Sequence, residues 1–170
     1  MESTKSFDNY PVWMVLVSNS VSLVLYLSGL YIMSEIGLWA SGLYLLYILI
    51  MEYRLLRYHC VNCYYYGKTC GFGQGRLSAL FFKKGDPAAF CSGKMEWKDM
   101  IPDILVSLIP FITGIILLIL DFNIILLAVL LLLVFLTTSG NAFVRGKLVC
   151  RFCRQREHGC PAEELFKKIR

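Results

Sequence analysis

The residues of this sequence whose types and spacing could do chemistry are its seven cysteines. Six of them form two copies of one pattern, C-x2-C-x6-C, displaced along the chain by 90 residues. In a C-x2-C turn two thiolates can meet one ion while backbone amides point at the sulfurs. We call each copy a cysteine knuckle. The first consists of Cys60, Cys63 and Cys70, and the second of Cys150, Cys153 and Cys160.

Clustered cysteines in a reducing compartment indicate metal ligation before disulfide formation. Zinc in structural sites takes four tetrahedral ligands, and one arrangement gives each knuckle its own ion. Cys91 would complete the first site, and His158 is the natural fourth ligand of the second. Because His158 stands only two residues before Cys160, a water or a residue from elsewhere is the other option there.

A second arrangement pools the two C-x2-C pairs, Cys60 with Cys63 and Cys150 with Cys153, in one site. The sequence leaves both arrangements open. Zinc is the first choice of metal, since C-x2-C pairs far apart in sequence are typical of it. An iron–sulfur cluster is the second, although the spacing matches neither common ferredoxin pattern. Thiol–disulfide chemistry and inert thiols are the remaining alternatives.

The composition of the chain indicates the class of protein that carries these cysteines. Of the 170 residues 57% are hydrophobic and 17% are charged, and the mean hydropathy is +0.60. A soluble domain is about 45–50% apolar and about 25% charged. The composition therefore excludes both a soluble globular domain and a disordered chain, and it indicates an integral membrane protein.

Two apolar stretches carry no lysine or arginine, residues 6–53 and 99–144. Each is about twice the ~20 residues that span a bilayer, so each predicts a helical hairpin with helices at 11–33 and 37–56, then 101–120 and 124–143. The fold class is therefore all-α, with four transmembrane helices and a small cytoplasmic metal-binding cap. The expected domains are a first hairpin (1–56), a Cys-rich loop (57–100), a second hairpin (101–143) and a Cys-rich tail (144–170).

Charge predicts the topology. Four spans place the N-terminus, the 57–100 loop and the tail on one side, and all 17 Lys and Arg lie there or at its membrane border. The two opposite turns carry only Glu35 and Asp121. By the positive-inside rule the charged side is cytoplasmic. The net charge of +5 then predicts contact with anionic lipid headgroups, and no nucleic acid is expected.

The two hairpins look like copies of one unit. At the displacement of the knuckles Phe7 aligns with Trp97, and Arg57 aligns with Lys147. A repeat of two spans keeps its orientation, so the copies would be parallel and related by a pseudo-twofold axis along the membrane normal.

Three classes of function fit these residues. The first is a zinc-binding membrane module that organises a cytoplasmic surface or a partner. The second handles metal ions or electrons at the membrane face. The third is an enzyme acting on a lipid-borne substrate through a zinc or cysteine centre; whether the chain is an enzyme is undecided. Transport is not favoured, because four short helices scarcely enclose a path. The expected partners are a second copy of the chain or another membrane protein.

Overall fold

The computed structural model describes residues 6–86, 90, 97–158 and 160, and this part of the chain is helical as predicted. Within it the one pairing of extended backbone is an isolated bridge between Phe7 and Cys153. The chain forms two compact units. We call residues 20–52 and 97–142 the helical unit, and the described residues of 1–19, 53–96 and 143–170 the cysteine unit.

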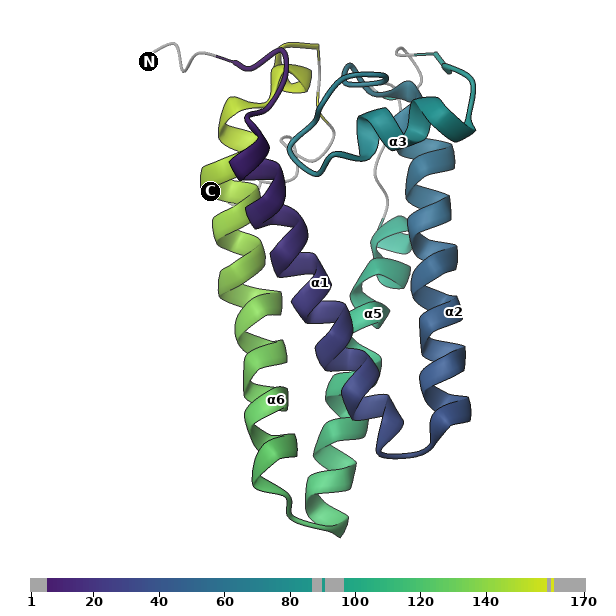
Figure 1. Ribbon diagram of the computed structural model, residues 1–170, viewed down its shortest axis with the longest axis vertical. Helices are drawn as coiled ribbons and strands as arrows, with labels where there is room; N and C mark the ends of the chain where they lie inside the picture. The colour runs from purple at the N-terminus through teal and green to yellow at the C-terminus, as the bar shows by residue number, and fades with distance from the viewer. Residues whose placement is uncertain (1–5, 87–89, 91–96, 159, 161–170) are drawn as a thin grey trace. The chain divides into compact units, whose positions relative to one another are not determined.

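Four long helices carry the apolar stretches of the sequence (Figure 1). Three helical segments are long and apolar enough to cross a membrane, namely Val12–Ser34, Ile101–Leu120 and Ile124–Phe152. The second helix has 17 residues, fewer than the ~20 that span a bilayer. The bounds are α1, Val12–Ser34; α2, Leu38–Arg54; α5, Trp97–Leu120; and α6, Ile124–Phe135.

Short turns join these helices in pairs, and both turns lie at the same end of the helical unit (Figure 1). Gly37 joins α1 to α2 with a φ of 152°, which favours glycine, and its carbonyl accepts the Ala40 N–H at 3.1 Å. Asn123 caps α6, since its side-chain oxygen accepts the Ile125 N–H at 2.9 Å. The sequence breaks around Glu35 and Asp121 therefore lie where the helices end.

The helical unit buries two apolar clusters between its helices. Ile32 on α1 and Leu133 on α6 are fully buried or nearly so. Apolar packing of this kind fixes the helices against one another. The first cluster comprises Leu25, Tyr44, Ile48, Val106 and Leu136, and the second comprises Ile32, Leu126, Leu130 and Leu133.

Within the first cluster, Tyr44 donates a hydrogen bond to the backbone of α5, a helix that contains proline. Pro110 lies inside α5 and has no N–H, so it cannot bond the carbonyl of Val106 four residues earlier. The Tyr44 hydroxyl donates to that carbonyl at 2.6 Å. Gly29 makes room for the ring, because a Cβ there would lie 2.4 Å from the Tyr44 oxygen.

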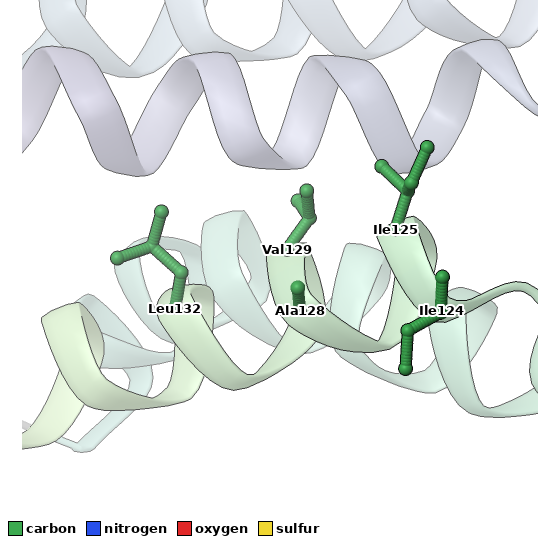
Figure 2. A pocket seen from close by; sticks show the side chains of 5 residues that line it. All are labelled: Ile124, Ile125, Ala128, Val129 and Leu132. Carbon is green, nitrogen blue, oxygen red and sulfur yellow. The ribbon is translucent and has the colours of Figure 1, made fainter.

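Many large apolar side chains face outward on the long helices. A surface of this kind is suited to the hydrocarbon of a bilayer and not to water. Leu38 is 88% exposed and Ile119 is 79% exposed. A hollow of about 370 Å³ on α6 is also lined only by apolar side chains (Figure 2). Such a surface suits lipid chains or an apolar helix and offers no polar group for chemistry. Its lining is Ile124, Ile125, Ala128, Val129 and Leu132.

The last long helix differs from the prediction that it ends at residue 143. It runs on to Phe152 through two π-helices, η3 (Leu136–Gly140) and η4 (Ala142–Val149), and a 3-10 turn, η5 (Cys150–Phe152). Gly140 and Gly146 lie inside this run without ending it. The charged residues from Arg145 onward set the limit of the apolar stretch but do not break a helix.

Candidate metal centre

The two knuckles are built alike. Each follows a π-helix, η1 (Leu55–His59) or η4, and opens with a 3-10 turn, η2 (Cys60–Asn62) or η5. The second cysteine then leaves the helix in an extended conformation, with ψ of 151° at Cys63 and 119° at Cys153. In each knuckle its N–H donates to the carbonyl of the first cysteine at 3.3 Å. This C-x2-C turn is the local shape that presents two sulfurs on one side.

The loop after the first knuckle turns back onto it. Helix α3 (Gln74–Phe81) packs against η1 and η2. At its start the Gly75 N–H donates to the Cys70 sulfur at 3.4 Å, and the Cys60 thiol donates to the Gln74 side chain at 3.8 Å. Only glycine fits at position 75, because a Cβ there would lie 2.1 Å from the Tyr65 carbonyl oxygen.

The two knuckles exchange hydrogen bonds reciprocally. The backbone N–H of Tyr64, one residue after Cys63, donates to the Gln155 side chain at 2.8 Å. The backbone N–H of Arg154, one residue after Cys153, donates to the Tyr65 hydroxyl at 3.0 Å. The two bonds are equivalent under the repeat. In both, the backbone N–H one residue after the second cysteine of one knuckle donates to the side chain two residues after the second cysteine of the other knuckle.

The N-terminal segment lies between the knuckles and contacts both. Phe7 donates its N–H to the Phe152 carbonyl at 3.1 Å and accepts the Tyr65 hydroxyl at 2.6 Å. The Tyr10 hydroxyl donates to the Val149 carbonyl at 2.7 Å. Burial raises the pKa of Tyr10 far above its ordinary range, so this hydroxyl keeps its proton and stays a donor.

An exposed charge network covers the outside of this junction. The Asp8 carboxylate accepts the Tyr64 hydroxyl at 2.8 Å and pairs with the Arg154 guanidinium. These hydrogen bonds, the one from Tyr64 first, lower the pKa of Asp8 below its ordinary value. Lys68 lies over the Tyr64 ring, 4.1 Å from its centroid, so cations from the first loop and the tail gather at the same place.

The second cysteines are the more deeply placed thiols. Burial raises the pKa of Cys63, and it raises that of Cys153 to about 12. Smaller increases come from charge on neighbouring thiols, Cys70 and Cys160 for Cys63, and Cys63, Cys150 and Cys160 for Cys153. Backbone N–H groups of Tyr65 and Gln155 lower the two values in part. Without a metal both groups are therefore neutral thiols at neutral pH.

The structure thus brings the two knuckles together, whereas the sequence left open whether they form separate sites. All six described cysteines are free thiols. Cys91 and the side chain of His158 lie outside the described residues, and the backbone of His158 ends the 3-10 helix η6 (Arg154–His158). Among the residues described, no three His, Cys, Asp or Glu side chains are grouped closely enough to hold a metal ion as they stand.

Sequence reasoning missed the residues that join the knuckles. Gln155 is only 3% exposed and Tyr65 is 2% exposed. Both lie in polar or aromatic stretches whose hydropathy does not alternate regularly, so the sequence does not predict that they are buried. Their equivalent positions, two residues after Cys63 and Cys153, were the available signal. Phe7 was noted only as the partner of Trp97 in the repeat, and its place between the knuckles depends on long-range contacts.

Comparison of the chain with models of protein families, with curated protein sequences and with solved structures gave no match to any of them.

Proposed function

We propose that this chain is a multi-pass membrane protein that binds a metal through its two cysteine knuckles and thereby organises a cytoplasmic surface. The observation that carries the proposal is the reciprocal hydrogen bonding between Tyr64 and Gln155 and between Arg154 and Tyr65. Two thiol-rich turns held together in this way bring six cysteines into one small unit. A unit with so little apolar core gains stability when a metal ties its loops together.

The proposed topology has four spans arranged as two parallel repeats. Helix α2 is the fourth span, because η1 extends its 17 residues by five to His59. The similar knuckles and the two turns at one end of the helical unit support the repeat (Figure 1). The distribution of Lys and Arg supports cytoplasmic termini.

The proposed sidedness is tested with single cysteines placed at Glu35 or Asp121. A membrane-impermeant thiol reagent should label them in intact cells, and failure to label them from outside would contradict the topology.

Zinc is the first metal we propose. The N–H groups that point at Cys70, Cys63 and Cys153 stabilise thiolates, as structural zinc sites require. The raised pKa values of Cys63 and Cys153 oppose a redox role, since a reactive cysteine needs a lowered value. Binding must then release thiol protons, so metal affinity rises with pH.

An iron–sulfur cluster is the second candidate, and one observation favours it. No three of the described metal-ligating side chains are close enough to bind one ion as they stand. A cluster of four irons and four sulfides holds its thiolates farther apart than a single ion does, because each of the four thiolates binds a different iron atom. Four thiolates suffice for such a cluster, and the function would then be electron transfer at the membrane face.

Helix α3 supports a contact of the cysteine unit with anionic lipid headgroups. Its outward side chains include Leu80, 79% exposed, and Phe81, 70% exposed. Arg76, Lys83 and Lys84 are exposed beside them. Apolar side chains flanked by cations suit the headgroup boundary of an anionic membrane, and we propose that α3 lies there.

Elemental analysis and the visible absorption spectrum of the purified full-length protein test the metal proposal. Zinc without colour supports the organising role, and iron with labile sulfide and a brown colour supports electron transfer. Chelation of either metal should raise hydrogen exchange in residues 60–82 and leave the helical unit protected. A protein purified under reducing, anaerobic conditions that holds no metal, and binds none when zinc or iron with sulfide is added, would refute the proposal.

A further inference from the structure

One exposed surface of the cysteine unit combines apolar side chains with cations. Leu80 and Phe81 at the end of α3 are exposed, and so is Tyr53 in the last turn of α2. Helix α3 packs against η1, and η1 continues α2 without a break. The surface therefore lies where the proposed fourth span leaves the membrane, a level that aromatic side chains favour.

Phe82 fixes an arginine at this surface. Its ring meets that of Tyr53 edge-on, with 5.5 Å between the centroids. The guanidinium of Arg57, an exposed residue of η1, lies over the same ring at 5.5 Å from the centroid. The Phe82 carbonyl also accepts the Tyr66 hydroxyl at 2.7 Å. The Arg57 charge is consequently held beside the exposed end of α3.

The lysine pair that follows, Lys83–Lys84, is tethered on both sides. Phe82 precedes it in an extended conformation, and after it the Gly85 N–H donates to the Val61 carbonyl of η2 at 3.0 Å. Gly85 lies close against Asn62, since an added Cβ would lie 2.0 Å from the Asn62 side-chain oxygen. The backbone is therefore held to the first knuckle, whereas both lysine side chains are exposed.

The charge of this part of the chain is strongly one-sided. Residues 53–86 contain six Lys and Arg and a single acid, Asp86. A concentration of cations next to exposed apolar side chains complements the phosphates and acyl chains of an anionic bilayer. A soluble anion would satisfy the cations but would leave Leu80 and Phe81 in water, so the combination favours a lipid.

We propose that Arg57, Lys83 and Lys84 form a binding site for the phosphate group of an anionic phospholipid, with Leu80 and Phe81 entering the acyl-chain boundary beside it. The inference rests on the proposed contact of α3 with the membrane and names the residues that select the lipid. It is independent of the metal that the knuckles bind. Because the lysine pair is tethered to η2, a bound lipid would hold the first knuckle at the membrane face.

The experiment measures lipid preference in the full-length protein after removal of native lipid in detergent. Phosphatidylglycerol and phosphatidylcholine with identical chains are added in equal amounts, and native mass spectrometry counts the lipids bound. The wild-type protein should prefer phosphatidylglycerol. Arg57→Gln, Lys83→Gln and Lys84→Gln should each lower this preference by about fivefold, the effect of one cation near an anionic surface. Arg156→Gln is the matched control, since it removes an exposed cation from the second knuckle, and it should leave the preference unchanged.

Two further variants separate the headgroup site from folding and from the apolar contact. Arg57→Lys keeps the positive charge and should retain the preference. Phe81→Trp places a fluorophore at the end of α3. In vesicles of brominated phosphatidylcholine and phosphatidylglycerol, the fluorescence that it adds to that of the wild-type protein should be quenched.

The outcomes distinguish the site from the membrane contact on which it rests. An unchanged preference in all three glutamine variants, with the added fluorescence of Phe81→Trp quenched, would overturn the headgroup site and leave α3 at the membrane. Added fluorescence that is not quenched would instead remove the proposed membrane contact itself. Displacement of phosphatidylglycerol by inorganic phosphate would also contradict the proposal, because it would assign the cations to a soluble anion.

Discussion

The Tyr44 hydroxyl lies 2.6 Å from the carbonyl oxygen of Val106 and donates to it. Since Pro110 cannot supply the N–H that a regular helix would place there, Tyr44→Phe leaves a buried carbonyl without its donor. An unsatisfied buried group costs about 1–3 kcal/mol. We expect a lower midpoint of thermal unfolding in detergent, followed by circular dichroism.

Two variants control this prediction. Tyr47→Phe removes a hydroxyl that donates to the Pro102 carbonyl at 2.7 Å, an acceptor to which α5 itself offers the Val106 N–H, so its effect should be smaller. Pro110→Ala restores the missing N–H, and the cost of Tyr44→Phe should fall in that background. Equal losses for Tyr44→Phe with and without Pro110→Ala would contradict the explanation.

Gly29 provides the second prediction, because a side chain there has no space. The added Cβ would lie 2.4 Å from the Tyr44 oxygen and 2.8 Å from two ring carbons. Gly29→Ala should therefore destabilise the protein by about 1–3 kcal/mol, as overpacking does. Gly42→Ala is the matched control, since nothing lies within 4 Å of its added Cβ and alanine favours a helix. A midpoint that rises in both variants would refute the close packing of Gly29 on Tyr44.

The positions of the helices could be predicted from the sequence, but the joining of the two cysteine knuckles could not. Apolar length and the breaks around Gly37 and Asn123 located four helices, because those signals are local. The run of α6 to Phe152 was missed because charged residues end an apolar stretch without ending a helix. Likewise the cysteine spacing indicated thiol-rich turns, yet the joining of the two turns depends on Gln155 and Phe7, whose partners are distant in sequence.

The pair of Asp8 and Arg154 predicts an acid-sensitive junction. Because the pKa of Asp8 is lower in the folded state, its contribution is present above the unfolded value of about 3.9 and is lost as the pH falls through the folded value. Stability should therefore show no step from this group between about pH 8 and 5, and a small loss below about pH 4. Hydrogen exchange of residues 60–70 at several pH values measures it.

Asp8→Asn is the test of that acid step, because the amide oxygen still accepts the Tyr64 hydroxyl but carries no charge for Arg154. The step should disappear in Asp8→Asn and persist in Asp121→Asn, whose carboxyl group lies in the α5–α6 turn. An unchanged acid step in Asp8→Asn would assign it to other groups.

The reciprocal bonds between the knuckles predict a loss that is shared between two distant residues. Gln155→Leu leaves the Tyr64 N–H without its acceptor, and Tyr65→Phe removes both the acceptor of the Arg154 N–H and the donor to the Phe7 carbonyl. Each should cost about 1–3 kcal/mol, seen as faster hydrogen exchange in the cysteine unit. Because both bonds hold the same junction, the double variant should lose less than the sum of the single losses.

Tyr66→Phe is the control, since its hydroxyl donates to the Phe82 carbonyl within the first loop and its loss should add to that of Gln155→Leu. Full additivity of Gln155→Leu with Tyr65→Phe would mean that the two knuckles are held independently.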